Sequence, residues 1–195
     1  MKPKIVKSLL LDRDGVINKL IQNNSGLISP QSVRDFTFKK GSKEAIMKAR
    51  DLGSSIFVVS NQPDVSKKWR KLDKDRLKDI NNKLNNIGIE KTFNCTHGPI
   101  GSQKSSTYTG ENGEIITCGC RKPQPGLIHK WYNEEDVKPE NTVFVGDNKT
   151  DIMAAKKFEE NTGTEFSSKI KIGESQGLCD KNMESLKQVV KSEIK

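Results

Sequence analysis

Short apolar segments alternate along the chain with segments of helical periodicity. The runs Ile5 to Leu11, Ser55 to Ser60 and Thr142 to Gly146 show no regular polar alternation, which predicts strands that are buried on both faces. A last strand is expected over Lys169 to Ile172. Strands of this kind are typical of parallel sheets covered by helices.

The segments between these strands predict the helices. Gly41 to Gly53 has apolar residues at helical spacing and ends on a glycine. A second helix is expected to end at Gly88 and a third to cover Asp151 to Phe158. The apolar stripe of the second helix consists of Leu77, Ile80, Leu84 and Ile87. The alternation predicts an α/β fold, a three-layer Rossmann-like parallel sheet with helices on both faces, in one domain over residues 1–195.

Polar side chains stand where three of the predicted strands end. Asp12 and Asp14 follow the first strand, Ser60 and Asn61 end the second, and Asp147 follows the third. Ligands of open parallel sheets bind at the carboxyl ends of the strands, so these side chains are candidates for one site. An Asp-x-Asp-Gly turn alone is a weak signal. A calcium loop is excluded because its other spaced acids and its distal glutamate are missing.

The positive net charge of the chain could indicate that it binds nucleic acid. The net charge is +9, but of 34 basic residues only six are arginine, and aromatic residues make up 6%. Nucleic-acid-binding surfaces rely on arginine and stacked aromatics, so we expect no nucleic-acid partner. The densest basic run, Lys67 to Lys78, is interrupted by Asp73 and Asp75 and is interpreted as a solvated helical face.

Apolar segments long enough for membrane insertion are not expected. Near the N-terminus only a three-leucine run precedes the charged cluster, which is too short for a signal peptide. No run approaches the length of a membrane span. The prediction is a cytoplasmic protein without a membrane partner, and a monomer.

Cysteine and histidine cluster around a loop-rich segment. Cys95-Thr-His97 and Cys118-Gly-Cys120 are separated by 20 residues, and the intervening Gly98 to Thr117 is predicted to be a long surface loop. Four such ligands complete a closed tetrahedral zinc site, which is structural because no position remains for water. Free thiols beside a lone histidine are the alternative, but they do not explain the clustering. A zinc loop over residues 95–120 is therefore expected.

Four segments together resemble the haloacid dehalogenase-like phosphatases, in the order of that superfamily's motifs. They are Leu-Leu-Leu-Asp12-Arg-Asp14-Gly-Val-Ile-Asn18, Val-Val-Ser60-Asn-Gln, Arg121-Lys122-Pro-Gln-Pro-Gly, and Val-Gly-Asp147-Asn-Lys-Thr-Asp151. The resemblance runs from about Ile5 to Phe158. It implies a phosphatase that forms an aspartyl-phosphate intermediate.

The resemblance also implies a role for each motif residue. Asp12 would be the nucleophile, and Asp14 the general acid and base. Ser60, Asn61 and Lys122 would bind the phosphoryl group.

A magnesium ion is implied as well, held by Asp12, the backbone carbonyl of Asp14, and Asp147. Magnesium neutralises the repulsion between a carboxylate and a phosphate. The role of Asp151 stays open at this point: it orients Lys122 or a metal-bound water, or it lies in the first turn of the following helix, where carboxylates are favoured.

The zinc loop narrows the resemblance within the superfamily. It is similar to the branch containing D-glycero-D-manno-heptose 1,7-bisphosphate phosphatases and histidinol-phosphate phosphatase domains. The intervals from Asp14 to Ser60 and from Ser60 to Lys122 leave no room for a separate cap domain. Heptose 1,7-bisphosphate is the expected substrate, losing its 7-phosphate, with Arg121 binding a second anionic group. Histidinol phosphate and a nucleic-acid 3′-phosphate are the alternatives.

Overall fold

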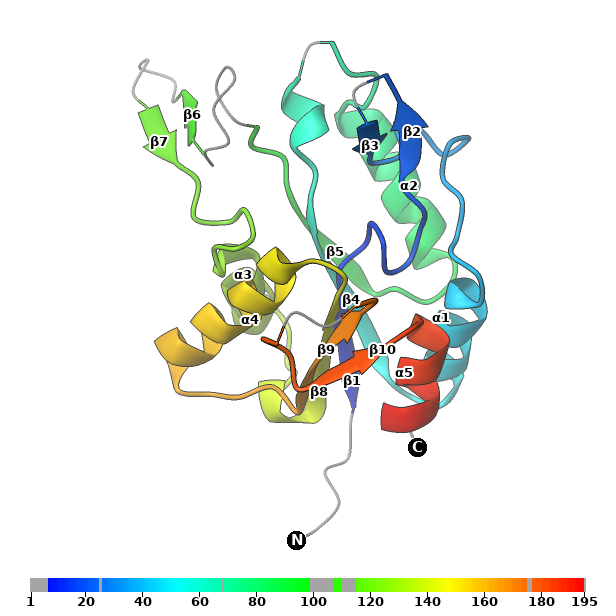
Figure 1. The fold of residues 1–195 in the computed structure, drawn as a ribbon, viewed down its shortest axis with the longest axis vertical. Helices are drawn as coiled ribbons and strands as arrows, with labels where there is room; N and C mark the ends of the chain where they lie inside the picture. Colours follow the sequence, from blue (N-terminus) through cyan, green and yellow to red (C-terminus); the bar gives the residue numbers. More distant parts are fainter. Residues whose placement is uncertain are drawn as a thin grey trace, which may run out of the picture.

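A six-stranded sheet in which all strands are parallel forms the centre of the protein (Figure 1). The computed structural model describes residues 7–24, 26–67, 69–98, 107–109, 115–174 and 177–194. The strand order is β10-β9-β8-β1-β4-β5. These strands are β1 (Ser8–Leu11), β4 (Ser55–Asn61), β5 (Lys91–Cys95), β8 (Thr142–Gly146), β9 (Ser168–Ile172) and β10 (Lys181–Met183). The predicted α/β fold is thereby confirmed.

The three strands that precede the candidate site residues are neighbours. β1 lies between β4 and β8, with Leu9 paired to Ile56 and to Val143. All four residues of β1 are buried, as expected for a strand covered on both faces. Because the three strands are parallel and in register, they end at the same edge of the sheet. Ile5 and Val6, at the start of the predicted first strand, lie outside the described residues.

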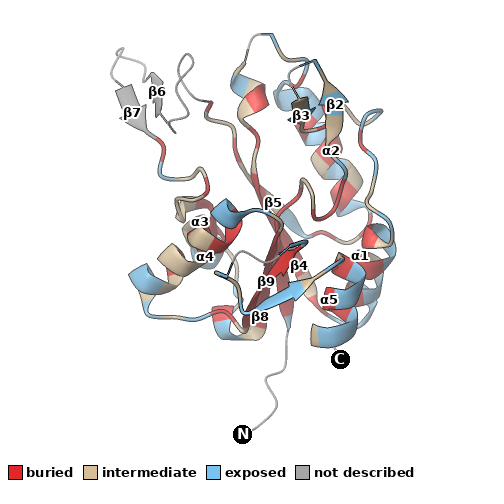
Figure 2. Cartoon of the chain, viewed as in Figure 1, coloured by how far each residue is buried: buried red, intermediate tan, exposed pale blue. Residues whose placement is uncertain are grey.

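Helices cover both faces of the sheet, which gives the three predicted layers. α1 (Ser42–Asp51), α2 (Lys74–Asn85) and α5 (Leu186–Glu193) pack on one face, and α3 (Gly126–Glu134) and α4 (Lys149–Thr162) on the other. Figure 2 shows the central strands buried and the outer faces of the helices exposed. In the described part of the chain, no helix is both long and apolar enough to cross a membrane.

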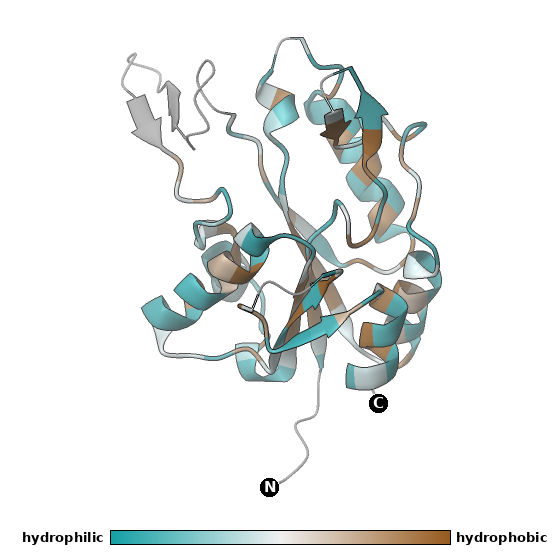
Figure 3. Ribbon diagram, in the orientation of Figure 1, coloured by the Kyte–Doolittle hydropathy of each residue, from teal (hydrophilic) through white to brown (hydrophobic). Residues whose placement is uncertain are grey.

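Alternation along the central strands divides the interior into two cores. Leu9 and Leu11 face α1, α2 and α5, whereas Leu10 faces α3 and α4. Figure 3 shows hydrophobic positions along the strands and on the helices that cover them. On the α3 side the fully buried Trp131 stacks on Phe166 with ring centroids 6.0 Å apart. Each such buried large side chain contributes roughly 1.5 to 3 kcal/mol.

The predicted helices are present, with shifted ends. α1 begins after Gly41, whose φ of 76° is a left-handed conformation that glycine adopts without strain. α2 begins at its N-cap Asp73, whose side chain accepts from the Arg76 N–H at 2.8 Å. The interpretation of Lys67 to Lys78 as one helical face is therefore wrong for its first half, since the aspartate cap starts the helix only at Lys74.

Two antiparallel hairpins lie outside the sheet and were not predicted. β2 (Ile21–Asn23) pairs with β3 (Gly26–Ile28), so the interval before Ser60 holds a hairpin as well as one helix. β6 (Thr107–Thr109) pairs with β7 (Ile115–Thr117). The segment Gly98 to Thr117, predicted to be a long surface loop, therefore contains a short hairpin, at positions where β-branched residues favour strands. The rest of that segment, except Gly98, lies outside the described residues.

Candidate active site

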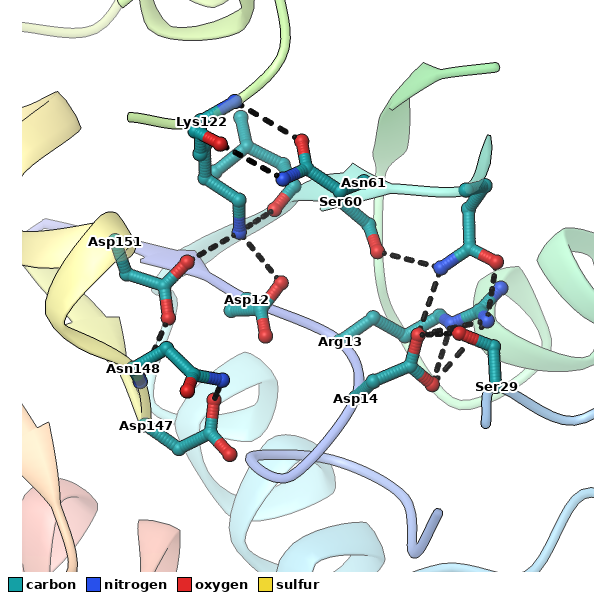
Figure 4. A network of polar contacts seen from close by, with 12 residues as sticks. Asp12, Arg13, Asp14, Ser29, Ser60, Asn61, Lys122, Asp147, Asn148 and Asp151 are labelled. Carbon is teal, nitrogen blue, oxygen red and sulfur yellow. Dashed lines mark hydrogen bonds and ion pairs between the residues drawn. The ribbon is translucent and has the colours of Figure 1, made fainter. Parts of the chain in front are cut away.

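The carboxyl edge of the sheet carries the residues predicted to perform the chemistry. Asp12 follows β1, Ser60 and Asn61 end β4, and Asp147 follows β8. The Asp12 N–H donates to the Val145 carbonyl at 2.8 Å, which extends the pairing of β1 with β8 by one residue. The register of the sheet thus brings these side chains into one cluster (Figure 4).

Lys122 is the buried cation of this cluster. Its Nζ lies 2.6 Å from Asp12 Oδ1 and 2.6 Å from Asp151 Oδ1, and it donates to the Val59 carbonyl at 2.9 Å. Burial lowers the pKa of a lysine, but the charges of Asp12 and Asp151 outweigh it and raise the pKa of Lys122. A fixed positive charge therefore lies beside Asp12 at neutral pH.

Asn61 fixes the main chain of Lys122. Its Oδ1 accepts from the Lys122 N–H at 3.0 Å, and its Nδ2 donates to the Lys122 carbonyl at 3.1 Å. Asn61 was predicted among the phosphate-binding residues. In the structure both polar groups of its side chain contact the Lys122 backbone, so Asn61 holds the lysine in place.

Asp151 combines two of the roles left open by the sequence. One oxygen pairs with Lys122, and the other accepts from the Asn148 N–H at 2.9 Å in a capping box at the start of α4. A side chain at Gly146 would place its Cβ 2.3 Å from the Asp151 Cβ. The close approach that Gly146 permits lets Asp151 reach the lysine.

Three carboxylates lie close together, and two of them, Asp12 and Asp151, pair with Lys122. One oxygen from each of Asp12, Asp147 and Asp151 lies within 4.8 Å of the others. Burial raises the pKa of Asp12 to about 8, with the Asp151 and Asp14 charges adding to it and Lys122 opposing it. Burial, then the Asp151 charge, raises the pKa of Asp147 to about 6. The cluster has more negative groups than positive ones, a suitable environment for a hard cation with oxygen ligands.

Gly15 lets the turn after β1 approach Asp147. Its φ is 86°, and a Cβ there would lie 1.8 Å from Asp147 Oδ2. The Gly15 carbonyl accepts from Lys39 Nζ at 2.5 Å. The Asp-x-Asp-Gly motif thus needs glycine both for its left-handed conformation and for its contact with Asp147.

A network of donors surrounds Asp14. Its carboxylate accepts from Gln62 Nε2 at 2.7 Å and from Arg13 Nη2 at 3.0 Å. Asn18 Nδ2 and Ser29 Oγ each donate to it at 2.8 Å. Burial acts to raise the pKa of Asp14, but Arg13 and these hydrogen bonds outweigh it and lower that pKa. The arrangement favours the ionised form.

The sequence reasoning missed Arg13, Asn18, Ser29 and Gln62 as parts of the site. Arg13, Asn18 and Gln62 are each 0% exposed, and Ser29 follows the β2–β3 hairpin directly. Arg13, Asn18 and Gln62 lie within the motif segments that carry the family resemblance, and their position there could have indicated that they belong to the site. Ser29 had no sequence signal, since only the fold brings the hairpin beside Asp14.

Arg121 has an unsatisfied donor group. Its Nη1 is buried and has no hydrogen-bond partner among the described residues. Buried donors are almost always paired in native proteins, so an unpaired guanidinium nitrogen is expected to meet a ligand or water. Arg121 directly precedes Lys122 in the chain.

A cavity of about 650 Å³ lies between α1 and α5 and is separate from this cluster. Lys39 and Gly41 are among the residues that line it, and none of the predicted site residues is. The candidate site is therefore at the open edge of the sheet and not in this cavity.

The predicted zinc ligands meet at a second cluster. The Sγ atoms of Cys95, Cys118 and Cys120 and the Nδ1 of His97 have pairwise separations of 2.8 to 3.6 Å. A hydrogen bond from Cys120 lowers the pKa of the Cys95 thiol to about 5, despite burial. The proton held in that bond, with burial, raises the pKa of Cys120. The structure brings all four side chains together without a disulfide among the described cysteines.

Comparisons with known proteins agree with this fold. Residues 115–163 match the family model described as haloacid dehalogenase-like hydrolase. The chain is 30% identical over 148 residues to the D-glycero-beta-D-manno-heptose-1,7-bisphosphate 7-phosphatase of Helicobacter pylori strain 26695, covering 76% of each protein. It is 27% identical over 179 residues to the alpha-anomer 7-phosphatase of Mycobacterium tuberculosis, covering 91% of this chain and 86% of the relative.

Solved structures show the same fold. A D,D-heptose 1,7-bisphosphate phosphatase from B. bronchiseptica, complexed with magnesium and phosphate, superposes with a TM-score of 0.70 over 95% of this chain and 96% of its own, at 22% identity. The chain belongs to the haloacid dehalogenase-like hydrolases. Within that family it is a phosphoric monoester hydrolase, of the group that includes the heptose-bisphosphate phosphatases.

Proposed function

We propose that the chain removes the 7-phosphate of D-glycero-D-manno-heptose 1,7-bisphosphate. The observation that carries the proposal is the cluster of Asp12, Asp14, Ser60, Lys122 and Asp147 at one sheet edge, in a chain whose relatives have this activity. We also propose that it acts as a single domain over residues 1–195 and as a cytoplasmic monomer. Both helical layers pack on the same sheet, which supports one domain.

The carboxylate cluster fits a magnesium ion. Asp12, Asp147 and the backbone carbonyl of Asp14 would hold it, because their oxygen atoms are ligands that Mg²⁺ prefers. The excess of negative groups over the single Lys122 supports this assignment. Bound magnesium would supply charge neutralisation between the nucleophile and the phosphate.

In the first half-reaction, an oxygen of Asp12 attacks the phosphorus and the bond to the sugar oxygen breaks. Lys122 holds Asp12 Oδ1 at 2.6 Å, which leaves Oδ2 for the attack. Lys122 and Ser60 are positioned to stabilise the charge on the phosphoryl oxygens. Asp14 gives the leaving oxygen a proton, the one that it took from water in the second half-reaction of the preceding turnover.

In the second half-reaction, Asp14 takes a proton from water, whose oxygen attacks the same phosphorus. The bond from phosphorus to Asp12 then breaks and inorganic phosphate is released. The structure shows Asp14 surrounded by donors that favour its ionised form, which is the form that accepts this proton.

We propose that Cys95, His97, Cys118 and Cys120 hold a structural zinc. A tetrahedron of sulfur and nitrogen ligands at about 2.0 to 2.3 Å from zinc has edges of roughly 3.5 Å, at the upper end of the observed separations of 2.8 to 3.6 Å. The site has four protein ligands and therefore no place for a reactive water. Its function would be to anchor the chain that leads from Cys120 into Arg121 and Lys122.

Magnesium affinity should rise with pH. Asp12 and Asp147, with pKa values of about 8 and about 6 in the metal-free protein, must lose their protons to bind the ion. We expect affinity to rise by about tenfold or more between about pH 5.5 and 8.5. Isothermal titration with Mg²⁺ across this range measures it, and a flat profile would contradict the assignment.

The same pKa values predict the stability of the metal-free protein. The folded state keeps protons on Asp12 and Asp147 that the unfolded chain loses near the ordinary value of 3.8. The unfolding free energy should therefore fall as pH rises from about 4 to about 8. Added magnesium should offset this loss, which denaturant melts with and without Mg²⁺ would show.

The substrate is tested by comparing kcat/KM for both anomers of heptose 1,7-bisphosphate, histidinol phosphate and a 3′-phosphorylated oligonucleotide. We expect a heptose bisphosphate to be hydrolysed best. Arg121→Ala should lower its kcat/KM by about tenfold or more, because a charge-assisted hydrogen bond to an anion is lost. The exposed Arg34→Ala is the matched control and should have no effect.

The outcome separates the substrate from the chemistry. If histidinol phosphate or the oligonucleotide is the better substrate by tenfold, the heptose assignment fails while the phosphatase activity stands. If Arg121→Ala and Arg34→Ala behave alike, Arg121 does not bind the second anionic group.

A further inference from the structure

A continuous chain of hydrogen bonds runs from Arg13 through Gln62 to Ser60. Arg13 Nη2 donates to Gln62 Oε1 at 2.8 Å, and Gln62 Nε2 donates to Ser60 Oγ at 2.8 Å. The exposed fractions of Arg13, Gln62 and Ser60 are 0%, 0% and 1%. Figure 4 shows Ser60 between the Asp12–Lys122 pair and the Arg13–Asp14 pair.

The direction of every hydrogen bond in this chain is forced. A guanidinium can only donate, so Arg13 requires the oxygen of the Gln62 amide to face it. The amide nitrogen then faces Ser60, and its second N–H reaches the Asp14 carboxylate at 2.7 Å.

The forced amide orientation determines what the Ser60 hydroxyl can do. Ser60 Oγ accepts from Gln62, so its own proton is not used in that bond. Within the part of the chain that the structure describes, no group accepts this proton. The hydroxyl is therefore left as a donor on the side of the cluster where the phosphoryl group is expected.

We propose that Gln62, locked by Arg13, is a positioning residue that orients the Ser60 hydroxyl as a donor to the phosphoryl group of the substrate. This inference rests on the proposed phosphatase function, because it assigns Ser60 to the phosphate. A serine hydroxyl rotates freely and can donate in several directions. Because the N–H of Gln62 already occupies one side of the Ser60 oxygen, the hydroxyl proton cannot point toward Gln62. Less entropy is therefore lost in orienting the hydroxyl when the substrate binds.

A double-mutant cycle tests the proposal, with inorganic phosphate as the probe and Mg²⁺ present. Gln62→Met keeps the side-chain volume but removes the amide, and should weaken phosphate binding about threefold to tenfold, the value of one neutral hydrogen bond. Ser60→Ala should weaken it by at least as much. In the Ser60→Ala background, Gln62→Met should have no further effect, because the hydroxyl that it orients is gone.

Gln62 also contacts Asp14, and the cycle separates the two contacts. An effect transmitted through Asp14 would persist when Ser60 is alanine, and would appear in kcat and not in phosphate affinity. Additive effects of the two substitutions on phosphate affinity would therefore overturn the proposal. So would an unchanged affinity in Gln62→Met, or a wild-type protein that does not bind phosphate.

Arg13 provides a second measurement. Arg13→Gln can both donate and accept, so the lock on the amide orientation is lost, whereas Arg13→Lys can still only donate. Phosphate affinity should fall more in Arg13→Gln than in Arg13→Lys, and equal losses would count against the lock. Gln188→Met on α5 is the matched control and should leave phosphate affinity unchanged. Gln62→Leu replaces Gln62→Met in the cycle if the latter does not fold.

The result also distinguishes this inference from the proposed function. If the wild type hydrolyses heptose bisphosphate but the effects of Gln62→Met and Ser60→Ala on phosphate affinity are additive, only the proposed role of Gln62 is excluded. If heptose bisphosphate is not hydrolysed but the effects of the two substitutions on phosphate affinity are coupled, the substrate assignment is excluded. The proposed orientation of Ser60 by Gln62 is then retained.

Discussion

Asp12→Asn is expected to abolish phosphate release, with a loss of at least about 10³-fold in kcat. An amide is a poor nucleophile and a poor magnesium ligand, so both functions proposed for this side chain are removed at once. The fold should survive, since Lys122 keeps its 2.6 Å ion pair with Asp151 and the asparagine has nearly the same shape.

Phosphate release from a sugar phosphate and the melting temperature are measured on the same preparation. Asp51→Asn, at the exposed end of α1, is the matched control and should retain full activity. Loss of activity in both variants would indicate a general effect of the substitution. Near-normal turnover in Asp12→Asn would exclude an aspartyl-phosphate on Asp12, because an asparagine side chain cannot form this intermediate.

The central sheet could be predicted because its strands are buried on both faces. Thr142 to Gly146 matches β8 at both ends, and β4 extends the predicted Ser55 to Ser60 by one residue. Such segments must be apolar throughout, so their signal does not depend on the rest of the fold. β10 (Lys181–Met183) and the two hairpins were missed, because three-residue strands have too few positions to show a period.

The chemistry-bearing side chains were predictable for a related reason. A parallel sheet places the ends of its strands together, so Asp12, Ser60 and Asp147 could be grouped from their positions after apolar runs. The connections between them could not. That Gln62 joins Ser60 to Asp14, or that Asn61 holds the Lys122 backbone, depends on side-chain directions that spacing does not encode.

Lys122 connects the two clusters of the molecule. It reaches Asp12 and Asp151 through its side chain, and in the chain it is separated from Cys120 by Arg121 alone. Asn61 hydrogen bonds to the Lys122 backbone, and in the turn before Lys122 the Gly119 carbonyl accepts from the Gly126 N–H at 3.0 Å. A metal bound by Cys118 and Cys120 would therefore help to position Lys122.

Cys118→Ser is accordingly expected to lower both stability and activity. One zinc per chain should copurify with the wild type, and the variant should lose most of it, because a serine hydroxyl replaces a thiolate ligand in a closed site. Structural zinc contributes strongly to folding, and a loss of roughly 3 to 5 kcal/mol would lower the melting temperature by roughly 10 °C in a chain of this size. Turnover should fall through displacement of Arg121 and Lys122.

Metal analysis, calorimetry and phosphate release on protein prepared without chelator measure these effects. Cys179→Ser is the matched control, because Cys179 lies outside the cluster and hydrogen bonds to Asn182. It should keep the zinc, the melting temperature and the activity. If wild-type protein contains no zinc, the four side chains do not form a structural metal site. The same conclusion follows if Cys118→Ser has the same melting temperature as Cys179→Ser. If zinc is lost while turnover stays normal, the site stabilises the fold without positioning Lys122.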